Sequence, residues 1–267
     1  MEKTKEKSKK LDLNIDPTEM ARAGLHFGHK TSKIHPKMRP FLYGARSGVH
    51  IFDVEKTSVN LKTALEFIQT MISEGKTILF VGTKVQIKKM VEETAKACGL
   101  PYIADRWLGG TFTNFETIKK RIDYFKELEN KKISGELAKY TKKERANFDK
   151  ELEELRLKFE GLRDLKGLPE VIFVLDIDKD ILAVREARAK GVKVIGVVDT
   201  NIDPALADYP IPANDDAVPG IKFILDKVKE VILKTEKKET SLATESPKTE
   251  MKGEKKAKSS LGAKNRK

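Results

Sequence analysis

The sequence predicts an α/β protein, with a parallel sheet and helices on both of its faces. Three uninterrupted apolar runs, at 77–81, 171–175 and 194–198, have the composition of strands that are covered on both sides. Segments with helical periodicity alternate with these runs, and a glycine ends each helix before the next strand begins. Such an alternation builds parallel strands joined by right-handed helical crossovers.

Two helices and a strand are predicted before the first apolar run. Asp16 is a good N-cap for a helix that has Pro17 at its first position and ends near Ala23, before Gly24. The run at 49–52 is a short strand, and Asp53 or a neighbour caps a helix over 54–73. The apolar face of this second helix comprises Val59, Ala64, Leu65, Ile68, Met71 and Ile72.

The alternation continues past the strand at 77–81 and then stops. Gly82 and Thr83 turn the chain into a helix over 85–98, and 101–104 is a third strand. Two segments follow in which apolar residues recur at steps of three and four, which predicts an antiparallel helical hairpin with a coiled-coil seam and a basic tip at 131–145. The two stripes comprise Phe115, Ile118, Ile122, Phe125 and Leu128, and Phe148, Leu152, Leu155, Phe159 and Leu162. Two unrelated surface helices are the alternative, but each stripe has the narrow width of a coiled-coil seam.

The α/β alternation resumes at Gly167, so the hairpin is an insertion. We expect strands at 171–175 and 194–198, a helix at 179–190, an edge strand at Ile211-Pro212 and a last helix at 217–233. The predicted organisation is a discontinuous α/β domain at 16–110 and 164–234, with the hairpin at 111–163. A flexible basic arm at 1–15 and a disordered lysine-rich tail at 235–267 flank this body.

Positive charge is concentrated at the two ends of the chain. The 267 residues carry a net charge of +12, and the pI is about 9.4. Residues 1–10 hold five Lys against two Glu, and residues 235–267 hold ten Lys or Arg against five Glu. The body between them is nearly balanced, so it must bind any polyanionic partner through a local patch.

The sequence also indicates the cellular compartment. Cys98 is the one cysteine, so no disulfide forms within the chain, as expected in a reducing cytosol. Its place near a helix end favours a buried filler over a nucleophile. No apolar run approaches the roughly 20 residues of a membrane span, and the charged N-terminus lacks the apolar segment of a signal peptide. We therefore expect a soluble cytoplasmic protein.

The stretch at 25–53 is the strongest candidate for a functional site. All four histidines of the chain lie in it, and Asp53 is its one acid. Pro36 and Pro40 argue against a helix, so we expect a long ordered loop. Cations interleaved with Phe27, Phe41 and Tyr43 are typical of an RNA contact, with the cations on phosphates and the rings on bases. A solvated basic loop with aromatic core anchors is the alternative. The histidines and cations are His26, His29, His35 and His50, and Lys30, Lys33, Lys37, Arg39 and Arg46.

Three other patterns suggest different chemistry. Gly82-Thr83-Lys84 enters a helix N-terminus and could hold a phosphate, but neither GxxxxGK[ST] nor GxGxxG occurs. His26 and His29 have zinc-like spacing without cysteine partners, so ring stacking or hydrogen bonding is favoured over a metal. The third pattern is a set of acids near strand ends: Asp176, Asp178 and Asp180, Asp199, and Asp215 and Asp216.

These acids could bind Mg²⁺ for phosphoryl chemistry. They loosely resemble the motifs of haloacid-dehalogenase hydrolases, but the strand with DxD comes late and no lysine motif is clear between Thr200 and the acidic pair. We favour the alternative, in which Asp178 or Asp180 and Asp215 or Asp216 cap helices and Asp199 orients a loop. No order of Ser, His and Asp, or of Cys and His, indicates a catalytic site.

Long strings of the sequence resemble one family. They are AGLHFGHKTSKIHPKMRPFLYGARSGVHIFDVEKT at 23–57, FVGTK at 80–84, DRWLGGTFTNFETIKKR at 105–121 and VVDTNIDPALADYPIPANDDA at 197–217. In this order they closely resemble the bacterial small-subunit ribosomal protein of the S2 family. The resemblance runs from Ile15 to Leu233 and does not cover the arm or the tail.

The resemblance implies a flavodoxin-like domain with an inserted coiled-coil hairpin, and a structural role in the small ribosomal subunit without catalysis. It implies binding to small-subunit (16S-type) rRNA at the junction of head and body, contacts with neighbouring ribosomal proteins, and help in docking the mRNA-binding protein S1. The hairpin indicates a bacterial or organellar origin. No cofactor, metal, membrane or small-molecule substrate is expected.

The resemblance also assigns residues. In the basic segment it implies RNA contact for His29, Lys30, Lys33, His35, Lys37, Arg39 and Arg46. In RWLGGTFTN we add Arg106, Trp107, Thr113 and Asn114, either as RNA-facing residues or as the hinge to the hairpin. For Trp107, a place in the core is an equal alternative.

Overall fold

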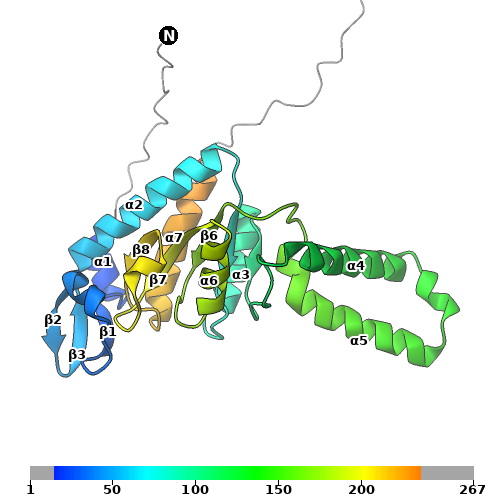
Figure 1. Ribbon diagram of the computed structural model, residues 1–267, viewed down its shortest axis with the longest axis horizontal. Helices are drawn as coiled ribbons and strands as arrows, with labels where there is room; N and C mark the ends of the chain where they lie inside the picture. Colours follow the sequence, from blue (N-terminus) through cyan, green and yellow to red (C-terminus); the bar gives the residue numbers. More distant parts are fainter. Residues whose placement is uncertain (1–14, 236–267) are drawn as a thin grey trace, which may run out of the picture.

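The computed structural model describes residues 15–235. A five-stranded parallel sheet lies between helices, with a small antiparallel sheet at one end of the molecule and two long helices at the other (Figure 1). Nearly all of the predicted arm and tail, 1–14 and 236–267, lies outside the described residues.

The parallel sheet confirms the predicted α/β class. Its strands stand in the order β5-β4-β6-β7-β8, and every neighbouring pair is parallel. Counted from β4, this is the 2-1-3-4-5 order of flavodoxin-like sheets. The edge strand β8 contains Pro210 and Pro212, which a central strand would not tolerate. The bounds are β4 Ile78–Val81, β5 Tyr102–Ile103, β6 Val171–Val174, β7 Lys193–Val198 and β8 Tyr209–Pro212.

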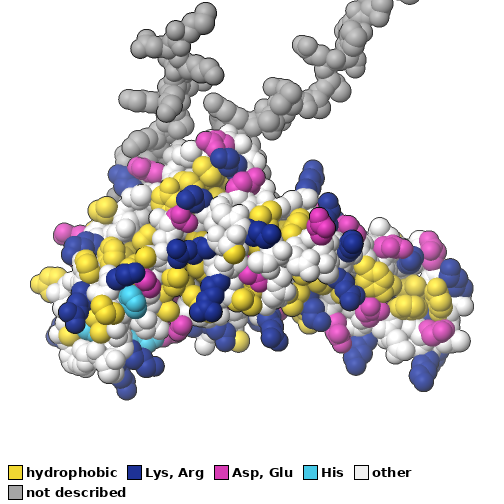
Figure 2. Space-filling view, viewed as in Figure 1, with side chains coloured by type: hydrophobic (Ala, Val, Ile, Leu, Met, Phe, Trp, Pro, Cys, Tyr) yellow, Lys and Arg dark blue, Asp and Glu magenta, His cyan; other side chains and the backbone are white. Residues whose placement is uncertain are grey.

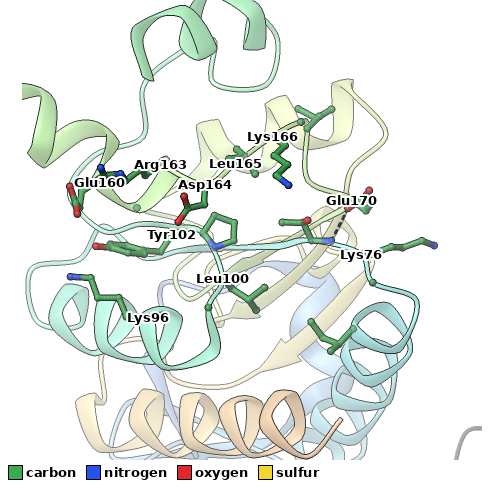
Figure 3. Close-up of a pocket in the computed structure, with 18 residues that line it drawn as sticks. Lys76, Lys96, Leu100, Tyr102, Glu160, Arg163, Asp164, Leu165, Lys166 and Glu170 are labelled. Atoms are coloured by element: carbon green, nitrogen blue, oxygen red, sulfur yellow. Dashed lines mark hydrogen bonds between the residues drawn. The ribbon is translucent and has the colours of Figure 1, made fainter. Parts of the chain in front are cut away.

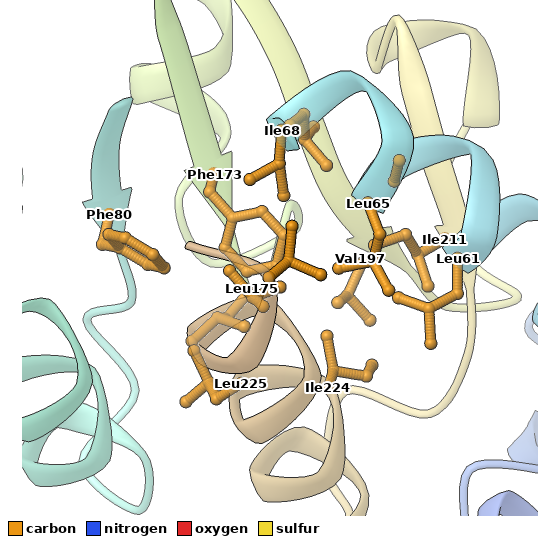
Figure 4. Packing of buried hydrophobic residues seen from close by; sticks show 14 of the residues in the cluster. Leu61, Leu65, Ile68, Phe80, Phe173, Leu175, Val197, Ile211, Ile224 and Leu225 are labelled. Carbon is orange, nitrogen blue, oxygen red and sulfur yellow. The ribbon is translucent and has the colours of Figure 1, made fainter. Parts of the chain in front are cut away.

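Alternate residues of the strands point to two different hydrophobic clusters. Ile78 and Phe80 pack with helices α2, α3 and α7 on one face of the sheet (Figure 4). Leu79 and Val81 pack on the other face with α6 and the segment around Trp107. Every residue of β4 and β6 is buried, because helices or loops cover both faces. The helices are α2 Val54–Ser73, α3 Lys88–Cys98, α6 Ile181–Ala189 and α7 Val218–Lys234.

Most helix boundaries follow the predicted signals. Helix α1 (Pro17–Arg22) is capped by Asp16, and Asp53 caps α2. Helix α3 begins at Lys88 rather than Val85, because residues 85–87 form a turn. Val59 was wrongly placed on the apolar face of α2: its side chain is 65 % exposed, and Leu61 is buried instead. Cys98 is buried, as predicted for a filler residue.

The strand predicted at 49–52 is confirmed, but the long loop predicted for the rest of 25–53 is wrong. This segment forms a three-stranded antiparallel sheet, β1-β3-β2, with a 3-10 helix between β1 and β2. Ser47 and Gly48 have φ of 50° and 77° and join β2 to β3 in a two-residue turn of the type that hairpins favour. Pro36 begins the 3-10 helix, where its missing N–H leaves no bond unmade, and Pro40 lies within this short helix. The bounds are β1 Phe27–Lys30, η1 Pro36–Phe41, β2 Leu42–Arg46 and β3 Val49–Phe52.

Two long helices, α4 (Phe115–Ile133) and α5 (Lys142–Phe159), follow β5 and precede β6 in the sequence. They extend from one side of the body (Figure 1). Arg156 of α5 donates to Glu129 of α4 at 2.8 Å, and Tyr124 donates to Glu151 at 3.2 Å. The residues of the predicted stripes are buried or half-buried. That this pair is a coiled coil stays a prediction. The remaining 3-10 turns are η2 Glu136–Lys139, η3 Glu160–Leu162 and η4 Pro204–Leu206.

Candidate nucleic-acid interface

The β1–β3 sheet with η1, residues 27–52, carries the predicted cations on its surface; we call it the basic sheet. Within the described residues 15–235, Lys30, Lys33, Arg39 and Arg46 are exposed and form no ion pair. Lys37 is also exposed, but its ammonium group lies 2.7 Å from Asp203. In the space-filling view, Lys and Arg side chains surround the histidines at this end of the molecule (Figure 2).

Two aromatic rings lie exposed on the same sheet. Tyr43 on β2 is 84 % exposed, and Phe27 on β1 is 48 % exposed. Neither ring is a core anchor, whereas Phe41 is half-buried and packs against the core. The combination of unpaired cations and exposed rings therefore favours a binding surface over a merely solvated one.

The two predicted histidines have structural contacts. His29 Nδ1 lies 3.0 Å from Asp199, and its backbone N–H donates to the Thr200 hydroxyl. The hydrogen bond to Asp199 raises the pKa of His29 above its usual value. His35 caps η1, and its backbone N–H donates to the Thr200 carbonyl at 2.7 Å. Both histidines thus attach the basic sheet to the loop after β7.

The second predicted group, around RWLGGTFTN, is held by Glu186, a residue outside all of the predicted site residues. Glu186 of α6 is buried and accepts hydrogen bonds from the backbone of Gly110, Phe112 and Thr113 and from Trp107 Nε1. Burial raises the pKa of Glu186, but these donors outweigh it, and the pKa lies below its usual value. The sequence does contain a signal for this role, because Glu186 is an acid on the otherwise apolar face of α6.

The residues of this group therefore differ in accessibility. Trp107 is 6 % exposed and packs edge-to-face on Phe112. Trp107 therefore lies in the core, which is one of the two alternatives that the sequence allows for it. Thr113 is exposed, but its hydroxyl lies 3.3 Å from Glu186. Arg106 and Asn114 are exposed, and Asn114 accepts from the Thr117 hydroxyl at the start of α4.

Replacing Glu186 by Gln should test its hold on this loop. An amide keeps one acceptor oxygen but turns an NH₂ group toward backbone donors, so we expect a loss of about 2 kcal/mol in the free energy of unfolding. Urea unfolding measures it. Glu153→Gln, at an exposed position on α5, is the control; equal stability of the two variants would contradict the role of Glu186.

The acids at the strand ends form a closed cluster around Lys84. Its ammonium nitrogen lies 3.1 Å from Asp176, 3.1 Å from Asp215 and 2.6 Å from Asp216. Burial lowers the pKa of Lys84, but the three carboxylates outweigh it and hold the pKa above its usual value. Burial, with the charges of Asp176 and Asp199, raises the pKa of Asp215 to about 7.

The helix-cap interpretation of these acids is wrong for α7 and correct for α6 in position only. Asp180 is the N-cap residue of α6, but its carboxylate makes no capping hydrogen bond and binds the backbone N–H and the hydroxyl of Thr83 at 3.1 and 2.8 Å instead. Ala217 is the cap residue of α7 and provides no side-chain bond. Asp199 does orient a loop, since it accepts from the backbone of Thr200 and Asp215.

This cluster also bears on the alternative chemistries. Thr83 and Lys84, the donors of a possible phosphate site, bind carboxylates of the same chain. Among the described residues, no group of three or more His, Cys, Asp and Glu has the geometry to hold a metal ion. Likewise, no helix in residues 15–235 is long and apolar enough to span a membrane.

A cavity of about 620 Å³ lies at the amino ends of β4, β5 and β6, near η3 (Figure 3). The Lys84 cluster lies at the carboxyl ends of the strands. The lining of the cavity mixes acids and bases. Lys96 pairs with Glu92, Arg163 pairs with Glu129, and Glu170 accepts from the backbone of Thr77. Because its charges are balanced within the chain, this cavity offers no preference for an anionic ligand.

Comparison with known proteins identifies the family. A family model described as "Ribosomal protein S2" matches residues 20–235. The chain belongs to the ribosomal protein S2 family. It is thus a ribosomal protein that takes part in translation, located in the ribosome in the cytoplasm, as the sequence predicts.

Individual S2 relatives are similar over most of their length. The small ribosomal subunit protein uS2 of Dictyoglomus thermophilum is 47% identical over 215 residues, which is 80% of this chain and 87% of the relative. The uS2 protein of Roseiflexus is 43% identical over 220 residues, 82% and 84% of the two chains. The uS2c protein of Rhodomonas salina is 44% identical over 214 residues, 80% and 88%.

Proposed function

We propose that this S2-family chain is a structural constituent of the small ribosomal subunit, and that the basic sheet is its main contact with 16S-type rRNA. One observation carries the proposal: four exposed cations without ion pairs in the described residues share this sheet with two exposed aromatic rings. The body of the chain is otherwise nearly balanced in charge. Binding should therefore depend on this local patch.

The mechanism is attachment, not turnover. Lys30, Lys33 and the two arginines neutralise phosphates, while His29 and His35 act indirectly by fixing the sheet to the body. The shape of the RNA backbone, rather than base identity, dominates such contacts, and salt weakens them. Arg106 and Asn114 form a second, smaller RNA contact, and Trp107 and Thr113 position the loop that presents it.

Several finer statements belong to the same proposal. The chain lies at the junction of head and body, contacts neighbouring ribosomal proteins, and helps to dock the mRNA-binding protein S1. Residues 16–110 and 164–234 act as one domain, and 111–163 is an inserted coiled-coil hairpin that moves with it. The protein is not an enzyme: the acids that resemble a hydrolase site are neutralised by Lys84.

Reversing two charges on the basic sheet tests the RNA contact. The double variant Arg39→Glu with Arg46→Glu should enter the small subunit about tenfold less well, because each change replaces a phosphate contact by repulsion. The measurement is the fraction of the chain that sediments with small subunits on sucrose gradients at low and at high salt.

The control is Lys62→Glu with Lys222→Glu, which changes the net charge equally at exposed positions of α2 and α7. It should sediment like the unmodified chain. Normal incorporation of the Arg39 and Arg46 variant at both salt concentrations would remove the basic sheet from the interface.

A further inference from the structure

A groove of about 690 Å³ lies at the carboxyl edge of the parallel sheet, and none of the residues that line it belongs to the basic sheet. The loops after β4, β5 and β6 line it. In the sheet order β5-β4-β6-β7-β8, the chain runs from β4 to β5 on one side and then adds the later strands on the other side of β4. The groove lies at this reversal of strand order, which is where open α/β sheets bind their ligands. The proposed RNA contact on the basic sheet does not use this groove.

The groove is held in shape by buried and part-buried hydrogen bonds. Thr83, after β4, binds the Asp180 carboxylate through both its backbone N–H and its hydroxyl, which fastens two of the three loops together. Trp107, after β5, is fixed to Glu186 of α6. The walls therefore exist before any ligand arrives, so binding orders little additional chain.

Two aliphatic side chains are exposed on the lining. Val85 is 78 % exposed, and Leu182 is 46 % exposed. They come from the loop after β4 and from α6, two segments that the Thr83–Asp180 bonds join. Exposed apolar side chains on a concave, prearranged surface are typical of a protein-binding site.

The free charge on the lining is positive. Lys179 is exposed and forms no ion pair within residues 15–235. Arg106, also exposed, is the residue assigned above to the second RNA contact, so the groove's own cation is Lys179. The acids of the groove are already occupied, since Asp105 lies 2.9 Å from Lys88 and Asp180 binds Thr83. Lys84 is neutralised by the cluster beneath it. A ligand therefore meets two aliphatic side chains beside the uncompensated ammonium group of Lys179.

We propose that this groove binds a short protein segment in which an apolar side chain is flanked by carboxylates. Val85 and Leu182 would cover the apolar side chain, and Lys179 would pair with a carboxylate. A protein segment is favoured over RNA because two aliphatic side chains are exposed on the lining, whereas its aromatic ring, Trp107, is buried and cannot stack on a base. The proposal rests on the proposed function in one respect: we place the partner segment in the ribosomal particle.

Photo-crosslinking within assembled particles tests this assignment. A benzophenone amino acid replaces Val85 in one variant and Leu182 in a second, so that loss of folding in one leaves the other. The control carries the same group in place of Val59, which is 65 % exposed on α2, outside the groove. Particles are purified, irradiated and digested, and crosslinked peptides and nucleotides are identified by mass spectrometry.

We expect positions 85 and 182 to crosslink the same segment of another protein, with Asp or Glu next to an apolar residue, and position 59 not to do so. Adding Lys179→Glu should lower the yield about fivefold, since one exposed ion pair is lost. Crosslinks to RNA alone, a segment without acids, a yield unaffected by Lys179→Glu, or no crosslink from either position would each overturn the proposal. Because particle entry is measured separately, failure here leaves the RNA contact of the basic sheet intact.

Discussion

Gly161→Ala should lower the free energy of unfolding by about 3 kcal/mol, the upper end of the usual cost of overpacking. A Cβ atom at Gly161 would overlap with the backbone carbonyl oxygen of Tyr102 and lie 2.8 Å from two atoms of its ring. A carbonyl in strand β5 cannot move aside as a flexible side chain can. The whole η3 turn, which joins α5 to the body, must shift instead.

Urea unfolding of the two chains measures the effect. Gly167→Ala is a matched control, because a Cβ there meets no atom within 4 Å and Gly167 does not have a positive φ. It should change the free energy of unfolding by about 0.5 kcal/mol or less. Any gain in stability would come from the lower conformational entropy of the unfolded chain. If both alanine variants unfold at the same urea concentration, the close approach of η3 to β5 is not a constraint on the fold.

Lys84→Met should have an effect of similar size, for an electrostatic reason. Removing one partner of a largely buried ion pair costs about 3 kcal/mol or more, because the remaining charges are left uncompensated. Here Asp176 and Asp215, each with only 6% of its side chain exposed, would repel each other without the ammonium group. The measurement is urea unfolding at pH 8.

The loss should shrink as the pH falls. The pKa of Asp215 is about 7 in the folded chain, above its ordinary value of 3.8. A carboxyl group with a raised folded pKa binds more protons folded than unfolded, so stability falls as the pH rises from about 4 to 7. The ammonium group of Lys84 lowers the pKa of Asp215. Removing Lys84 therefore raises this pKa further, and the pH range over which stability falls extends to higher pH. Lys84→Met should therefore be less destabilising at pH 5 than at pH 8.

Two comparisons distinguish this explanation from lost packing. Lys88→Met breaks an exposed pair with Asp105, in which both side chains are 40% exposed, and should cost about 0.5 kcal/mol. Adding Asp215→Asn to Lys84→Met should recover part of the stability, because it removes one of the repelling charges. A Lys84→Met loss that is independent of pH and not relieved by Asp215→Asn would point to packing instead.

Local patterns were sufficient for most of the parallel sheet and its helices. Asp16 and Asp53 cap the helices that follow them, and the apolar runs at 77–81 and 171–175 are strands. These signals act over a few residues, so they can be read without knowing the fold. The basic sheet was missed because its prolines outweighed the Ser47-Gly48 turn, although that turn is also a local signal.

The candidate site was only partly predictable. The sequence indicates which cations are available at 25–53, but their exposure depends on the sheet that carries them. It placed Asp180, Asp215 and Asp216 at helix starts, where capping is the commonest use of an acid. In the fold, Thr83 and Lys84 compete for these carboxylates from a distant loop: Thr83 is 97 residues from Asp180, and Lys84 is 131 residues from Asp215.

The sequence by itself determined the α/β class, the order of most elements and the supply of cations, because these depend on local composition and periodicity. It indicated the family through the resemblance of long strings to known members. Only the tertiary structure decided which polar groups meet. It placed His29 on Asp199, Lys84 among three acids, and Glu186 beneath the loop at Trp107. Such contacts are fixed by the order of parallel strands, which brings the ends of distant segments to one edge of the sheet, and no local pattern encodes that order.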